Sequence, residues 1–201
     1  MATRKEQAAL AKGRLMQAAK DLIAREGYDK ITIADITAAC NMSVGNFYHY
    51  FKSKGELITV MEQEPFQGKS SELQQMKDRP ILEQLCFYID YWIHLGVDTY
   101  GLSFTRQWFT YHVSNPTTLD DPQNKDNLEL NNLRFLFAHA IEKGELAAET
   151  PVEAIVQSIV FTLKGGDFHF TITGGEFNYI AWGEDYCKTI LPLLLAPWYV
   201  K

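Results

Sequence analysis

Apolar residues recur every three or four positions along most of the chain, which is the spacing of amphipathic helices. Residues 8–25 follow this spacing and are ended by Gly27, and residues 128–143 follow it and are ended by Gly144. Residues 168–173 alternate between apolar and polar, but a single short strand would have nothing to pair with. The pattern therefore predicts an all-α fold.

The C-terminal part of the chain predicts two further helices. Thr150 followed by Pro151 is a typical helix start, with an N-cap and then a proline in the first turn. The glycine pair at 174–175 predicts a break after this helix, and Asn178 is placed to cap a last helix that reaches about Leu195.

Residues 32–57 predict two short helices and the start of a third. Thr32 is a favourable N-cap for the first helix, and Ser43 is one for the second, which covers residues 44–51. Asn41, between them, tolerates the left-handed conformation that a tight turn needs. Two helices joined by such a turn form a helix-turn-helix unit, whose second helix enters the major groove of DNA.

The second of these helices carries side chains suited to reading DNA. Gly45 permits a close approach, and Lys52 and Lys54 lie next to the N-terminus of the third helix, where positive charge favours a phosphate. The other candidates carry hydrogen-bonding or hydroxyl-tipped side chains: Ser43, Asn46, His49, Tyr48 and Tyr50.

This block resembles the DNA-binding domain of the TetR family of transcriptional regulators, whose pattern is T…I…A…G-x-x-Y-x-Y/H-F-x-x-K-x-x-L. The matching positions are Thr32, Ile36, Ala39, Gly45, Tyr48, Tyr50, Phe51, Lys54 and Leu57. The sequence departs from the family at the turn, where Cys40, Asn41 and Met42 replace the common Ala-Gly-Val. Because Asn can hold the backbone angle that Gly usually supplies, we expect the turn to be kept.

The resemblance implies a homodimeric regulator, most often a repressor, that binds double-stranded DNA at a palindromic operator. The residues expected to hold phosphates are Thr32, Tyr48, Tyr50, Lys52 and Lys54. The residues expected to face base edges are Ser43, Val44, Asn46 and His49, with Gly45 among them. Phosphate contacts would set the register and base contacts the sequence preference.

The third helix of the motif is expected to continue past Met61 until Pro65 kinks or ends it. We therefore expect a DNA-binding domain over residues 1–64 and a ligand-binding and dimerisation domain over residues 65–201, with either a hinge or a plain break at residues 65–68. Together the three-helix head and the helical body would contain about nine helices.

Charge is distributed unevenly between these parts. The net charge of the whole chain is −6, which by itself argues against a nucleic-acid partner. Residues 1–60, however, hold nine Lys and Arg against six Asp and Glu, while the remainder holds ten against 19. A basic head on an acidic body directs one end of the chain toward phosphate.

Several classes of protein are disfavoured by the sequence. The most apolar stretch, residues 190–200, is short and broken by prolines, and the charged N-terminus lacks the apolar core of a signal peptide, so we expect no membrane association. Cys40, Cys86 and Cys187 show neither metal-ligand spacing nor a disulfide framework, which favours a reducing cytoplasm. No catalytic or phosphate-binding motif is present, and we expect neither an enzyme nor a cofactor or metal.

Aromatic residues are concentrated in the middle of the chain, between residues 87 and 111, with more further on. They could line a pocket for a small apolar or aromatic effector, although core packing accounts for any single one of them. Because the resemblance implies a ligand-responsive body, we expect a pocket formed by Trp92, Trp108, Tyr111, His112, Phe135, His139 and Phe161.

The last two predicted helices carry regular apolar stripes. The resemblance implies that these helices pair across a two-fold axis, which suits a reader of palindromes. The residues expected at this interface are Val152, Ile155, Val156, Ile159, Val160, Leu163, Ile180, Cys187, Ile190, Leu191 and Leu194. The competing interpretation is that both stripes face only the core of their own chain.

Two alternatives to a ligand-responsive regulator remain open at this point. The body could bind no small molecule and respond to a protein partner, or it could respond to no effector at all. From another class, the chain could be a helical small-molecule-binding or catalytic protein that keeps an unused helix-turn-helix head.

Overall fold

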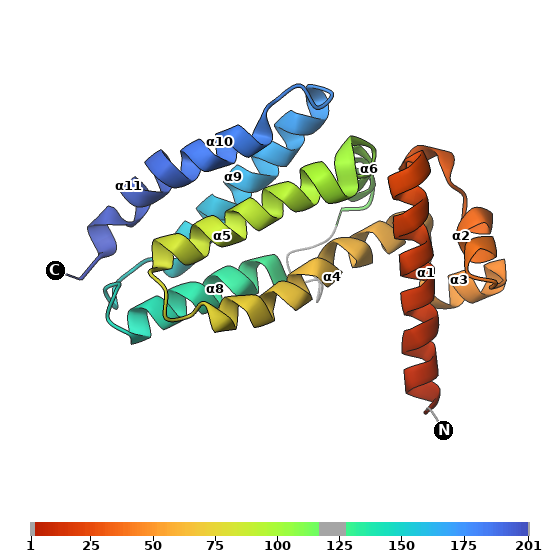
Figure 1. Cartoon of the computed structure of the whole chain (residues 1–201), viewed down its shortest axis with the longest axis horizontal. Helices are drawn as coiled ribbons and strands as arrows, with labels where there is room; N and C mark the ends of the chain where they lie inside the picture. Colours follow the sequence, from red (N-terminus) through yellow and green to blue (C-terminus); the bar gives the residue numbers. More distant parts are fainter. Residues whose placement is uncertain (1–2, 117–127, 201) are drawn as a thin grey trace. The chain divides into compact units, whose positions relative to one another are not determined.

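The computed structural model describes residues 3–116 and 128–200, and they are almost entirely helical (Figure 1). Within these residues the only β feature is an isolated antiparallel bridge between Leu146 and Tyr199. The predicted all-α class is therefore confirmed.

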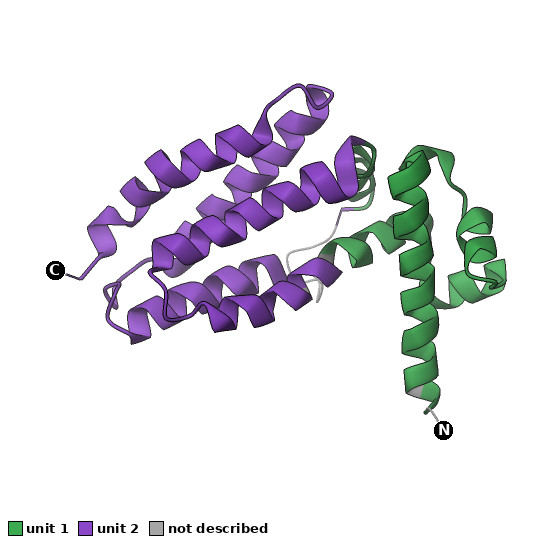
Figure 2. Ribbon diagram, viewed as in Figure 1, with its two compact units in different colours: residues 1–62, 103–115 green, residues 63–102, 116–201 purple. Residues whose placement is uncertain are grey.

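The chain forms two compact units, which Figure 2 colours separately. Unit 1 consists of Met1–Glu62 and Ser103–Asn115, and unit 2 consists of Gln63–Leu102 and Pro116–Lys201. The chain first passes from unit 1 to unit 2 after Glu62, close to the domain boundary expected after residue 64. The return of residues 103–115 to unit 1 was not expected, because nothing local in the sequence marks it.

Unit 1 begins with the long helix α1 (Arg4–Glu26), the 3-10 turn η1 (Tyr28–Lys30) and the short helices α2 (Ile33–Ala39) and α3 (Val44–Tyr50). It also contains the first part of α4 (Lys54–Gln75) and most of α6 (Gly101–Ser114). Its core is formed by apolar side chains that are almost completely buried: Leu15, Ala19, Ile36, Phe47, Phe51, Leu57, Ile58 and Met61.

Helix α4 does not end at Pro65, so one of the two effects expected of this proline, the end of the helix, is wrong. Proline removes one backbone hydrogen bond, but local preference is outweighed here by packing. Phe66 and Leu73 are buried in the core of unit 2, and the side-chain amide of Asn132 donates to the Phe66 carbonyl at 3.1 Å. These contacts anchor the turns that follow the proline.

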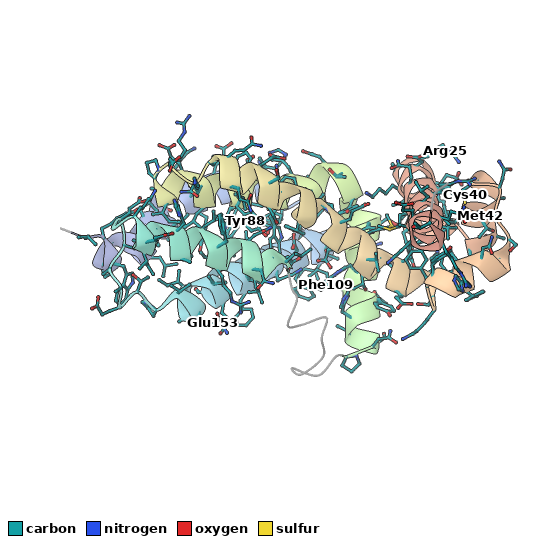
Figure 3. The ribbon with its side chains drawn as sticks, turned by 90° about the horizontal axis from the view of Figure 1, so that it is seen from below. Arg25, Cys40, Met42, Tyr88, Phe109 and Glu153 are labelled. Carbon is teal, nitrogen blue, oxygen red and sulfur yellow. The ribbon has the colours of Figure 1, made fainter. Side chains whose placement is uncertain are left out.

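Unit 2 is a bundle of helices around one apolar core. Its elements are the second part of α4, α5 (Ile81–His94), the π-helical segment η2 (Leu95–Tyr100), α8 (Leu128–Glu142), α9 (Val152–Ile172), α10 (Tyr179–Asp185), the π-helical segment η3 (Tyr186–Ile190), α11 (Leu191–Leu195) and the 3-10 turn η4 (Ala196–Trp198). Tyr88 lies fully buried among these helices, as Figure 3 shows, and its hydroxyl donates to the Glu129 carbonyl at 3.1 Å.

Local signals in the sequence place most helix ends correctly. Gly144 and the pair at 174–175 adopt positive φ at the predicted ends of α8 and α9. Asn178 accepts a hydrogen bond from the Ala181 amide at 3.1 Å, so the predicted cap of the last helix is confirmed. That helix is continuous through η3 and α11, with a π-helical segment that the sequence did not predict.

A search of the described residues for a helix long and apolar enough to span a lipid bilayer finds none.

Candidate nucleic-acid interface

Helices α2 and α3 and the turn between them form the helix-turn-helix unit that the sequence predicts. Thr32 caps α2, since its hydroxyl accepts from the Asp35 amide at 3.2 Å while the Asp35 carboxylate accepts from the Thr32 amide at 2.7 Å. The Thr32 hydroxyl also donates to this carboxylate, which lowers the pKa of Asp35. Thr32 therefore fixes the start of α2.

Hydrogen bonds from α1 and from within the unit hold the turn between α2 and α3 in place. Asn41 adopts φ 53°, so the expectation that Asn replaces the family's usual Gly in the left-handed conformation is confirmed. The Met42 amide donates to the Thr37 carbonyl at 2.8 Å, and the Arg14 guanidinium of α1 donates to the Cys40 carbonyl. These bonds tie the turn to α1 and set the orientation of α3.

Helix α3 buries one side and exposes the other. Phe47 and, directly after the helix, Phe51 are buried in the core of unit 1. The Ser43 hydroxyl accepts from the Asn46 amide at 3.2 Å and caps the helix. The exposed side, which we call the reading face, consists of Ser43, Val44, Gly45, Asn46, Tyr48 and His49.

The reading face combines apolar and polar groups. Tyr48 is 56% exposed and Val44 is 43% exposed, beside the polar side chains of Ser43 and Asn46. Tyr50 is only half-buried, and its ring packs edge-on against that of His49. All of the residues expected to face bases are thus exposed on α3 and its N-cap, while the buried side of the helix packs in the core of unit 1.

The two lysines after α3 differ in their surroundings. Lys52 is exposed. The Lys54 ammonium turns inward, donating to the carbonyls of Tyr28 at 2.9 Å and Ile31 at 2.6 Å, and it lies 3.9 Å from the centre of the Tyr28 ring. Burial lowers the pKa of Lys54, and Asp29 and Asp35 oppose this shift. Lys54 thus links the start of α4 to η1.

We expect Lys54→Met to lower the free energy of unfolding by about 1–2 kcal/mol, because two backbone carbonyls lose their charged donor. The matched change Lys52→Met, at an exposed side chain, should shift it by less than about 0.5 kcal/mol. Urea unfolding of both variants measures the difference. Equal effects would mean that the inward contacts of Lys54 contribute nothing to stability.

Helix α6 packs against the start of α4 and against η1 within unit 1. The Tyr28 amide donates to the Ser103 hydroxyl at 3.1 Å, and the Trp108 indole N–H donates to the Glu62 carboxylate. The Tyr111 ring lies so close to Gly55 that a Cβ there would meet it at 2.1 Å. Sequence reasoning missed this role of Gly55, although a glycine in a first helical turn is a weak signal of close packing.

The seven residues expected to line an effector pocket do not gather within either unit. Unit 1 contains three of them, Trp108, Tyr111 and His112. The rings of Trp108 and His112 stack there with their centres 4.1 Å apart. The other four belong to unit 2: Trp92, Phe135, His139 and Phe161. Trp92 is buried, whereas Phe161 is 71% exposed on α9, and Phe135 stacks with His139 on α8.

Charged groups lie inside unit 2 around Trp92. Its indole N–H donates to the Asp167 carboxylate at 2.9 Å, and the Lys164 ammonium lies 4.8 Å from the centre of its ring. Lys164 also pairs with Glu129 at 3.1 Å, and the Glu129 side chain is only 1% exposed. Sequence reasoning did not identify this cluster, because its members come from three different helices.

The residues expected at a dimer interface divide into two groups. Those that pack into the core of their own unit are Ile155, Val156, Ile159, Val160, Leu163 and Leu191, while Val152, Ile180, Cys187 and Leu194 are half-buried against that core. Of the whole set, only Ile190 is exposed. The exposed apolar residues on α9 and α11 are instead Phe161, Phe168, Ile172 and Leu193.

No group of three or more His, Cys, Asp or Glu side chains that could hold a metal ion occurs in the part of the chain that the structure describes.

A tri-helical head with a capped helix-turn-helix and an exposed second helix defines a helix-turn-helix DNA-binding protein. Residues 15–61 match the model of the bacterial regulatory proteins of the tetR family. The head of this chain is therefore a DNA-binding domain of the TetR type, and the chain is a DNA-binding regulator.

Similarity to a known protein extends beyond the helix-turn-helix head of the chain. An uncharacterised HTH-type transcriptional regulator of Haemophilus influenzae is 26% identical over 146 residues, which are 67% of this chain and 70% of that protein.

Two solved structures share the fold. A TetR-family regulator from Pectobacterium atrosepticum superposes with a TM-score of 0.70 at 19% identity, covering 100% of this chain and 99% of the other. FadR from Bacillus subtilis in complex with stearoyl-CoA superposes with a TM-score of 0.58 at 17% identity, covering 92% of this chain and 97% of the other.

Proposed function

We propose that this protein is a ligand-responsive repressor that binds a palindromic operator as a homodimer. The observation that carries the proposal is the reading face, a group of exposed apolar and hydrogen-bonding side chains on a helix whose other side is buried. One short helix reads only a few base pairs, so a two-fold dimer would be needed for a specific site. A regulator of this kind acts in the cytoplasm, where the DNA is.

Within the head, the exposed side chains are the proposed DNA contacts. Ser43, Val44, Asn46 and His49 would face base edges, with Gly45 allowing close approach. Tyr48, Tyr50 and Lys52 would hold phosphates. The contributions of Thr32 and Lys54 would be indirect, because the hydroxyl of the first is bonded to Asp35 and the ammonium of the second to backbone carbonyls.

The proposed dimer contact is the exposed side of α9 together with α11. Phe161, Phe168 and Ile172 recur at helical spacing on α9, and Ile190 and Leu193 are the exposed apolar residues at the far end of the last helix. Exposed aromatic and aliphatic side chains on neighbouring helices are typical of a surface that is covered in an assembly. The proposed interface therefore lies on the exposed sides of these helices, and it shares only Ile190 with the set expected from the sequence.

The proposed effector is a small apolar or aromatic molecule bound in the body. The support comes from a protein of the same fold, since FadR of Bacillus subtilis was solved with stearoyl-CoA. By linkage, an inducer must bind the form of the dimer that does not fit DNA better than the form that does. Residues of the expected lining that lie within unit 2, Trp92 foremost, are the first to test.

The direct test is selection of bound fragments from random duplex DNA by the purified protein, followed by affinity measurements across salt concentrations. We expect one palindrome to be enriched. Tyr48→Ala should weaken its binding by about 1–3 kcal/mol, roughly 5- to 150-fold. Lys52→Met should lower the slope of log affinity against log salt by about 0.9.

The charge-matched control is Lys77→Met, at an exposed lysine of unit 2, which should change neither quantity. Lack of any enriched sequence, with weak binding that is equal in all variants, would contradict the proposal. It would favour a helical ligand-binding or catalytic protein with an unused head.

A further inference from the structure

Unit 2 contains a pocket of about 290 Å³ where α5 packs against α10 and η3. Two cysteines line it, Cys86 from α5 and Cys187 from η3, and both are half-buried. They are 101 residues apart in the sequence, yet the Cys86 sulfur lies 4.0 Å from the carbonyl oxygen of Cys187. The fold therefore brings two free thiols together at a site that the DNA-binding function does not use.

The two thiols differ in character. The contact with Cys187 lowers the pKa of Cys86, against the effect of burial. The same contact, together with burial, raises the pKa of Cys187. Because the thiolate is the reactive form, Cys86 is the better nucleophile, and Cys187 remains a protonated neighbour.

Both apolar and charged side chains line the pocket. Asp90, Glu184 and Lys188 line it beside the thiols, and the Lys188 ammonium pairs with the Glu184 carboxylate at 3.0 Å. Cys187 lies in the π-helical segment, an irregularity that is frequent at functional sites. The third cysteine offers an internal comparison, because the buried Cys40 thiol donates to the Ile36 and Thr37 carbonyls at 3.3 and 3.5 Å.

We propose that Cys86 and Cys187 form a thiol-oxidation site that a peroxide converts to an intramolecular disulfide. The Cys86 thiolate attacks one peroxide oxygen, the O–O bond breaks, and the leaving hydroxide takes up a proton to become water. The resulting Cys86 sulfenic acid is attacked by the Cys187 sulfur, an S–S bond forms, and a second water leaves. Two thiols are oxidised and one peroxide is reduced to two waters.

The disulfide would join α5 to the last helix. Since that helix also carries Ile190 and Leu193 of the proposed dimer contact, oxidation would restrain a helix close to that surface; this consequence rests on the proposed function. The oxidation site itself does not, because it depends only on contacts within unit 2.

The test treats the full-length, reduced protein with hydrogen peroxide, blocks the remaining thiols with iodoacetamide and measures the intact mass. We expect the loss of two of the three alkylatable thiols, a Cys86–Cys187 linked peptide after digestion, and full recovery with dithiothreitol. Cys40→Ser should behave like the wild type.

A second variant identifies the order of the steps. In Cys187→Ser the Cys86 sulfenic acid should persist and be captured by dimedone, whereas in Cys86→Ser no thiol should be lost at the same peroxide dose. Three results would overturn the proposal: a disulfide between two chains, oxidation of Cys40 ahead of the pair, or independent over-oxidation of Cys86 and Cys187 without a link. Because peptide mapping of the wild type is decisive, the conclusion does not depend on the folding of the variants.

Discussion

Replacing Lys164 with Met is expected to lower the free energy of unfolding by about 3 kcal/mol, because it removes a cation that pairs with a buried carboxylate. The Glu129 side chain is 1% exposed and its oxygen lies 3.1 Å from the Lys164 ammonium. A charge in such a place depends on the opposite charge beside it, since the surrounding protein solvates it poorly. Guanidinium-induced unfolding of the purified variant provides the measurement.

Two control variants distinguish the effect of an unpaired buried charge from the effect of losing any lysine. The double variant Glu129→Gln with Lys164→Met removes both charges and should recover at least half of the lost stability. Lys188→Met removes a lysine whose ion pair with Glu184 is exposed, and this should cost less than about 1 kcal/mol. If Lys164→Met costs no more than Lys188→Met, the buried pair stabilises unit 2 no more than an exposed pair does.

Replacing Gly166 with Ala is expected to destabilise unit 2 by about 1–3 kcal/mol, despite the higher helix propensity of alanine. A Cβ at this position would meet the Tyr179 ring at 2.3 Å. That ring cannot move aside easily, because Tyr179 is 1% exposed and its hydroxyl donates to the Leu163 carbonyl at 2.7 Å. The same contacts raise the pKa of Tyr179 through burial.

The matched change is Gly68→Ala, which lies inside α4 in the same unit, with nothing within 4 Å of an added Cβ. There alanine should stabilise the helix by up to about 1 kcal/mol. Thermal unfolding followed by circular dichroism distinguishes the two variants, and we expect shifts of opposite sign. A stabilising shift in both variants would show that helix propensity, rather than the packing of Tyr179, dominates at Gly166.

The comparison of prediction and structure is clearest at single residues. Asn41 was expected to replace glycine in a left-handed turn, and its φ of 53° agrees, because that preference belongs to the residue itself. Pro65 was expected to kink or end α4, and it does not end it, because Phe66 and Leu73 anchor the following turns in the core of unit 2. The motif position of Lys54 was recognised, but its ammonium contacts carbonyls 23 and 26 residues away.

By itself the sequence determined most helix ends, the helix-turn-helix head and its resemblance to the TetR family, because caps, turn residues and apolar periodicity act between neighbours in the chain. Only the tertiary structure decided which side of α9 is buried, why Gly55 and Gly166 must be glycine, and that Cys86 and Cys187 meet. Those outcomes depend on which distant surfaces pack together, and in a chain whose helices are apolar on more than one side, periodicity does not specify that choice.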